Sequence, residues 1–160
     1  MILLGLGANL PSAIGPPVAT LDAALDALAA AGVIIRRRSS WYRSAPVPAG
    51  DQPWYVNGVV AVETRLGAPA LLALLHRVEA GFGRIRRERN EPRVVDLDIL
   101  DYDGEIRAEG PMLPHPRMHE RSFVLLPLRE VAPDWRHPIS GAALPVLIAA
   151  LPSDQLTERI

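Results

Sequence analysis

The sequence contains no cysteine and no lysine, and these two absences exclude whole classes of chemistry. Without cysteine the chain has no disulfide, no thiolate nucleophile and no thiolate metal ligand. Without lysine it has neither Schiff-base catalysis nor the lysine of a phosphate-binding P-loop. Any clamp on phosphate must therefore be made of arginine, protonated histidine, backbone amides or a metal ion.

Aromatic residues and long apolar runs are also scarce, and the net charge is close to zero. Aromatics make up 5% of the 160 residues, and the formal net charge is -1, which does not favour general nucleic-acid binding. The N-terminal apolar stretch has no basic residue before it and is interrupted by Gly5 and Gly7. It is typical of neither a signal peptide nor a membrane span, so we expect a cytoplasmic protein. The length fits a single domain over 1–160.

Hydrophobic periodicity predicts an α+β fold. Strands are expected over 2–6, 33–43, 55–64 and 94–102, with a short return strand near Ile106. Helices are expected over 18–31, 70–80, 120–131 and 142–151, with Pro127 favouring a break or a late start in the third. The order of the first six elements predicts a ferredoxin-like split βαβ core, in which helices pack on an antiparallel sheet. The proline- and arginine-rich segments 45–54 and 84–93 are expected to be loops and candidate lids.

Two aspartates alternate with apolar residues in the fourth strand. Because alternate side chains of a strand share a face, Asp96 and Asp98 should point the same way and Leu97 the opposite way. Two carboxylates about 6 Å apart repel by roughly 2–3 kcal/mol, which would raise one pKa unless a cation lay between them. Hard divalent cations prefer such oxygens. The alternative is a solvated strand face, but the apolar surroundings and the adjacent arginines favour the metal site.

Arginines crowd the segment that precedes the aspartates. Five fall within ten residues, at positions 84, 86, 87, 89 and 93. Such a run is often a solvated surface, yet a polyphosphate would neutralise it, and arginine grips phosphate bidentately. A cationic loop beside metal-binding carboxylates is the minimum equipment for phosphoryl transfer. Further along, the flanking prolines hold His115 in an extended loop, which excludes a helical zinc pair with His119 and leaves phosphate contact or plain exposure.

Several segments together resemble the hydroxymethyldihydropterin pyrophosphokinase family. They are residues 5–10, 51–57, 92–99 and 114–118, together with Arg121 and Phe123. The resemblance covers most of the chain, and its specificity lies in the order of these segments. It implies an enzyme that transfers the diphosphate of ATP to the hydroxymethyl group of 6-hydroxymethyl-7,8-dihydropterin and releases AMP, in folate biosynthesis.

The resemblance also implies a role for each matching residue. Asp96 and Asp98 would bind two magnesium ions and, with Arg84 and Arg93, would be catalytic. The expected ATP contacts are Glu79, Arg84, Arg86, Arg93, His115 and Arg121. The expected pterin contacts are Ser44, Ala45, Val47, Tyr55, Asn57 and Phe123, with Tyr55 and Phe123 stacking on the pterin and Asn57 bonding its edge. The departures Asn90-Glu91, His76 and Pro116 leave lid closure and the adenine contacts open. A monomer is expected, and association with other folate enzymes stays open.

Two other functions are compatible with parts of the pattern. A ferredoxin-like sheet can bind RNA, but no strand carries the aromatic-rich RNA-binding pattern. A magnesium-dependent nuclease would share the aspartate pair, and pterin-dependent release of AMP would exclude it.

Overall fold

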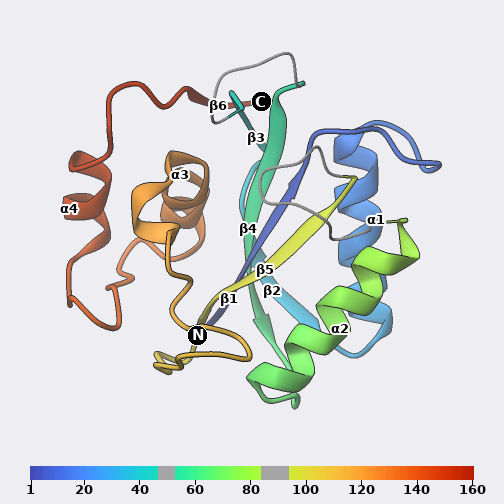
Figure 1. The fold of residues 1–160 in the computed structure, drawn as a ribbon, viewed down its shortest axis with the longest axis horizontal. Coiled ribbons are helices and arrows are strands. Elements are labelled where there is room, and N and C mark those ends of the chain that lie inside the picture. Colours follow the sequence, from blue (N-terminus) through green and yellow to red (C-terminus); the bar gives the residue numbers. More distant parts are fainter. Residues whose placement is uncertain (47–52, 84–93) are drawn as a thin grey trace.

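The structure is a computed structural model that describes residues 1–46, 53–83 and 94–160. Its central sheet is antiparallel and carries helices on both faces (Figure 1), which confirms the predicted α+β class. The strands are β1 (Ile2–Ala8), β2 (Ile34–Arg38), β3 (Tyr42–Ser44), β4 (Tyr55–Glu63), β5 (Asp96–Tyr102) and β6 (Thr157–Arg159). The helices are α1 (Pro17–Ala30), α2 (Ala68–Gly81), α3 (Ser122–Val131) and α4 (Leu144–Ala149), with a 3₁₀ turn η1 (Met118–Glu120).

The order of the strands places β1 at the centre of the ferredoxin-like core. The sheet runs β5-β1-β4-β3-β6, and β2 pairs with the other end of β4. Because β1 lies between β4 and β5, its residues are backed on both sides by antiparallel partners. The first six elements expected from the sequence therefore assemble as the split βαβ arrangement requires.

The sheet separates two apolar cores. On one face α1 and α2 cover Leu4, Leu6 and Ile99, and on the other α3 and α4 cover Leu3 and Leu100. The alternation of side chains along each strand distributes these residues between the faces. Proline 127 does not break α3: the helix runs through it, and Pro127 itself is buried. Burial of that apolar face offsets the hydrogen bond that proline cannot donate.

The prediction of a single strand over 33–43 is wrong, because the structure has two strands there, β2 and β3, separated by residues 39–41. The backbone N–H of Ser39 donates to the carbonyl of Val59 at 2.9 Å, and the Ser39 hydroxyl accepts from the Val59 N–H at 3.0 Å. A serine side chain thus replaces one rung of the ladder and ends β2. An additional bulge lies between Ile35 and Arg37.

The return strand expected near Ile106 is also absent from the structure. The turn itself forms, with positive φ at Asp103 and Gly104, but only an isolated bridge between Arg107 and Leu113 follows. The chain then passes Pro111 and Pro114, whose nitrogens cannot donate to a ladder. In the residues that the structure describes, no helix is long and apolar enough to cross a bilayer.

Candidate active site

A cavity of about 530 Å³ opens where the middle of the sheet faces the start of α3. Nine residues predicted from the sequence as site residues line it: Ser44, Ala45, Tyr55, Asn57, Asp96, Asp98, His115, Arg121 and Phe123. They come from β3, β4, β5, the loop before η1 and the start of α3, and so from segments up to 79 residues apart (123 minus 44). The sequence assigned these residues to phosphate, metal or pterin, and the fold gathers them into one cavity. Glu79 is the exception among the predicted site residues that the structure describes.

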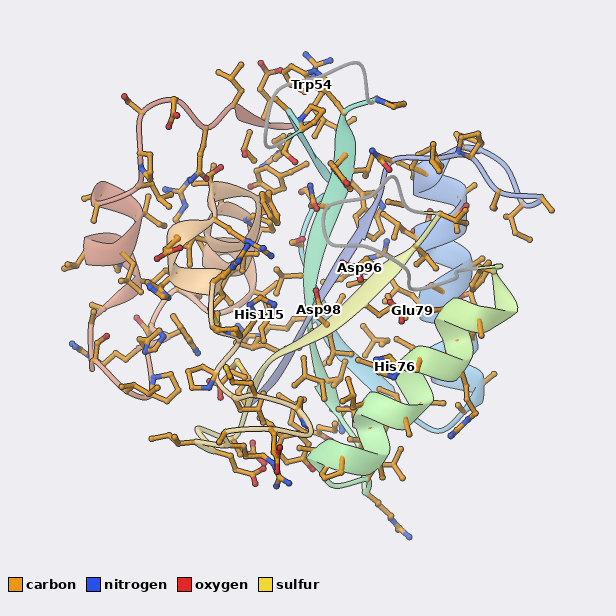
Figure 2. The ribbon with its side chains drawn as sticks, in the orientation of Figure 1. Trp54, His76, Glu79, Asp96, Asp98 and His115 are labelled. Atoms are coloured by element: carbon orange, nitrogen blue, oxygen red, sulfur yellow. The ribbon has the colours of Figure 1, made fainter. Side chains whose placement is uncertain are left out.

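The two aspartates lie side by side on β5 and face this cavity. Asp96 and Asp98 are partly exposed, whereas Leu97 between them is buried against α1 and α2. Their shared face, predicted from strand alternation, is confirmed (Figure 2). The pair is therefore set at the boundary between the apolar sheet and the open cavity, where carboxylate oxygens can still reach a ligand.

Glycines of β1 form the floor beside the aspartates. Gly5 pairs with Asp98 and Gly7 with Asp96 across the ladder. A Cβ atom on Gly7 would lie 2.9 Å from Oδ1 of Asn57, closer than real Cβ atoms approach. Alternate glycines thus keep the backbone of β1 open to the cavity.

Asn57 is held by a buried polar contact. Its Nδ2 donates to the hydroxyl of Ser44 at 2.8 Å, and both side chains are buried. The contact ties β4 to β3 and holds the Asn57 side chain in place. A carboxamide has four hydrogen-bonding positions and Ser44 takes one of them, so Asn57 can also bind the polar edge of a flat heterocycle.

His115 is neutral at physiological pH and presents a donor. Burial, the largest cause, lowers the pKa of His115 to about 4; the Arg121 charge also lowers it, while Asp96 acts in the opposite direction. Its Nδ1 accepts a hydrogen bond from the backbone N–H of Arg117 at 3.2 Å. The proton of the neutral ring is therefore on Nε2. His119 faces elsewhere: its ring meets His137 edge-on at 5.4 Å, and the expected absence of a His115–His119 helical pair agrees with this packing.

Arg121 and Phe123 enter the cavity from the first turn of α3. Arg121 is the residue before the helix, in an extended conformation, and its guanidinium lies 5.3 Å from the centre of the Phe123 ring. This stacking orients a cation and an aromatic face together. Tyr55, on β4, lines the same cavity and supplies a second aromatic ring.

Of the predicted site residues that the structure describes, Glu79 is the one that does not line the cavity. It is only 1% exposed on α2 and accepts a hydrogen bond from the backbone N–H of Leu97 at 2.8 Å. Figure 2 shows it on the α2 side of β5, away from His115. Among the strands that the structure describes, β5 lies at the edge of the sheet, so this carboxylate satisfies a backbone donor that β1 does not. Its nucleotide contact stays a prediction.

Four predicted site residues lie outside the described part of the chain: Val47, Arg84, Arg86 and Arg93. Conversely, the cavity is also lined by residues to which sequence reasoning assigned no role, among them Gly5, Gly7, Arg117, Glu120 and Gln155. The alternation of glycines inside a strand could have indicated the first two, because it marks a close backbone approach. No local pattern marks Gln155.

Comparison with known proteins agrees with this geometry. Residues 3–133 match the family model described as 7,8-dihydro-6-hydroxymethylpterin-pyrophosphokinase. A protein of Synechocystis sp. PCC 6803 is 44% identical over 148 residues, which cover 91% of this chain and 73% of that protein. One of Pseudomonas aeruginosa is 42% identical over 162 residues, which cover 99% and 96%. Both relatives are named 2-amino-4-hydroxy-6-hydroxymethyldihydropteridine pyrophosphokinase.

Proposed function

The chain belongs to the 7,8-dihydro-6-hydroxymethylpterin-pyrophosphokinase family, and from this we propose that the cavity between β5 and α3 is its catalytic site. The protein is an ATP-dependent pyrophosphokinase of folate biosynthesis. It transfers the diphosphate of ATP to the hydroxymethyl group of 6-hydroxymethyl-7,8-dihydropterin and releases AMP. The observation that carries the assignment of the site is the convergence of a carboxylate pair, an arginine, a histidine and two aromatic rings in one cavity.

The carboxylate pair fits magnesium. Asp96 and Asp98 offer hard oxygen ligands on one face, next to open cavity volume. Within 1–46, 53–83 and 94–160 there is no group of three or more histidine, cysteine or acidic residues that could hold a metal. Magnesium commonly keeps several waters and takes one or two carboxylates plus substrate phosphates, so two protein ligands suffice. The family resemblance implies two magnesium ions, and we assign them to these aspartates; bound there, they would neutralise charge on the transferred phosphates.

The pterin is assigned to the part of the cavity that Phe123, Tyr55 and Asn57 line. Phe123 on α3 and Tyr55 on β4 supply aromatic surfaces, and a flat heterocycle stacks favourably on such rings. Asn57, held in place by Ser44, would bond the polar edge of the ring. Ala45 would complete the pocket through its backbone, and Val47 belongs to the same expected set but lies outside the described residues.

Positioning and charge neutralisation account for the chemistry. The pterin hydroxyl attacks the β-phosphorus of ATP and loses its proton to water, the bond from that phosphorus to the oxygen that bridges it to the α-phosphorus breaks, and AMP leaves with that oxygen. Neutral His115 would donate its Nε2 proton in a hydrogen bond to a phosphate oxygen, while Nδ1 is occupied by the Arg117 amide and is not free to act as a base. Arg121 would bind another phosphate oxygen. Such preorganised donors stabilise the charge that develops during transfer.

The remaining assignments rest on the resemblance. Arg84, Arg86 and Arg93 would close over the triphosphate, and Glu79 would lie near the nucleotide. We propose a cytoplasmic monomer consisting of one domain over 1–160, with ATP and the pterin as its partners and no nucleic acid or membrane partner. The close pairing of β6 with β3 supports a single unit that includes the C-terminal residues.

The test is AMP release that requires both magnesium and the pterin. Asp96→Asn and Asp98→Asn should each lower kcat at least about a hundredfold while the melting temperature is kept, because each removes a metal ligand. Asp134→Asn, at an exposed position on the α3 side of the molecule, is the matched control and should keep full activity. Full activity in both site variants would refute the metal assignment. Magnesium-independent, salt-sensitive RNA binding in place of turnover would instead favour an RNA-binding module.

A further inference from the structure

The C-terminal residues return to the cavity from outside the segment that the family model matches. That match ends at residue 133, whereas β6 pairs with β3 over Ser44↔Thr157 and Tyr42↔Arg159. Just before β6, the carbonyl of Leu156 accepts a hydrogen bond from the backbone N–H of Ala45 at 3.1 Å. The end of the chain therefore supports the wall of the cavity assigned to the pterin.

Gln155 bridges two peptide groups next to Arg121. Its Nε2 donates to the carbonyl of Glu120 at 2.7 Å, and its Oε1 accepts from the backbone N–H of Ser122 at 2.7 Å. A backbone carbonyl only accepts and a backbone N–H only donates, so these two partners determine the orientation of the carboxamide. The two bonded groups flank Arg121 on either side, and Gln155 itself lines the cavity.

This bridge replaces a local helix cap. Arg121 precedes α3 with φ −114° and ψ 114°, and its own side chain makes no capping hydrogen bond. The first N–H groups of a helix have no partner within the helix, and Ser122 N–H is the first of α3. Gln155 supplies that partner from 33 residues away. A second contact, between the hydroxyls of Ser122 and Thr157 at 2.6 Å, holds the same point.

We infer that Gln155 is a positioning residue for diphosphate transfer: by bridging Glu120 and Ser122 it fixes the backbone of Arg121 and, through it, the direction of Arg121 and Phe123. The inference rests on the proposed function of the cavity. In an antiparallel ladder, hydrogen bonds to the carbonyl before a residue and to the N–H after it hold that residue extended. Here the side chain of Gln155 makes both bonds and does the same for Arg121. Without the bridge, Arg121 can leave its extended conformation, and the guanidinium and the stacked ring of Phe123 lose their common orientation.

The test compares Gln155→Met, which keeps the length of the side chain but neither hydrogen bond, with wild type. The matched control is Asp154→Ala, on the exposed neighbouring residue of the same segment. Binding of 6-hydroxymethyl-7,8-dihydropterin is titrated with magnesium and a saturating non-hydrolysable ATP analogue, and the KM for the pterin and kcat are measured separately. Gln155→Ala is the second variant, and the melting temperature of each protein is recorded.

Gln155→Met should raise the Kd and KM for the pterin about tenfold, with Asp154→Ala within about twofold of wild type. A purely structural role would lower the active fraction, and so kcat, and leave the KM unchanged. The inference is overturned if folded Gln155→Met and Gln155→Ala bind the pterin as wild type does, or if Asp154→Ala loses as much affinity. A wild-type protein without pterin-dependent release of AMP would instead refute the proposed function, so the two failures are distinguishable.

Discussion

The depressed pKa of His115 predicts that the metal-free protein loses stability in mild acid and that His115→Gln removes part of this loss. In the folded chain burial lowers the pKa of His115 to about 4, whereas an unfolded histidine has a pKa near 6.5. As the pH falls below about 6.5, the unfolded state therefore binds a proton that the folded state does not. Stability is complete above that value and decreases as the pH falls toward about 4.

The magnitude follows from the two pKa values. Between about pH 7.5 and pH 4.5 the linkage relation gives a loss of about 2.5 kcal/mol in the free energy of unfolding. Partial exposure of the ring to solvent reduces this to about 2 kcal/mol. Glutamine does not titrate, and its Oε1 can still accept the hydrogen bond from the Arg117 amide that Nδ1 of His115 accepts.

Urea unfolding of both proteins with EDTA at the two pH values measures the effect. Every other titrating group, including His137 with its lowered pKa, is present in both proteins and cancels in the comparison. Wild type should lose about 2 kcal/mol more than His115→Gln on acidification. Equal losses would refute the assignment of His115 as a neutral donor in the folded protein.

Two further substitutions test the glycine floor of the cavity and the buried hydrogen bonds of Asp101. Gly7→Ala, whose Cβ would lie 2.9 Å from Oδ1 of Asn57, should weaken pterin binding about five- to a hundredfold, as expected for overpacking; Gly5→Ala, which meets only the flexible end of Leu100 at 3.3 Å, should do less, and the reverse order in a titration would contradict the model of the floor. Asp101→Asn should lower the free energy of unfolding by about 1–3 kcal/mol, because one amide cannot accept on both atoms from the Trp135 indole and the Gly104 N–H. Chemical denaturation checks this against Asp103→Asn, which alters an exposed contact with the N-terminal amine, and a loss as large there would count against the buried network.

The aspartate pair and the separation of the two histidines could be predicted from the sequence because they depend on short-range rules, whereas the expected pterin and ATP contacts came from the family resemblance. Strand alternation alone places Asp96 and Asp98 on one face and Leu97 on the other, and the structure has them so. The flanking prolines exclude a helical histidine pair, and His115 and His119 indeed face different partners. Periodicity also located α1 and α2 within one or two residues of their ends.

The errors occur where distant residues compete with local pattern. The strand expected over 33–43 is divided because Ser39 bonds to Val59, which lies 20 residues away. Pro127 remains inside α3 because the buried face of the helix outweighs one missing hydrogen bond. Neither the hydrogen-bond partner of Ser39 nor the packing of α3 can be predicted from the residues next to them in the sequence.

By its residue types and spacing, the sequence determined the chemistry: arginine without lysine, an alternating aspartate pair, and aromatic rings placed within recognisable family segments. Only the tertiary structure decided which groups meet. Folding brings Gln155 into hydrogen bonds with the peptide groups before and after Arg121. It also places Gly7 against Asn57, and it turns Glu79 toward Leu97 and away from the cavity. Local periodicity is a property of neighbouring residues, whereas these contacts join parts of the chain that become adjacent only when the sheet and its two cores have formed.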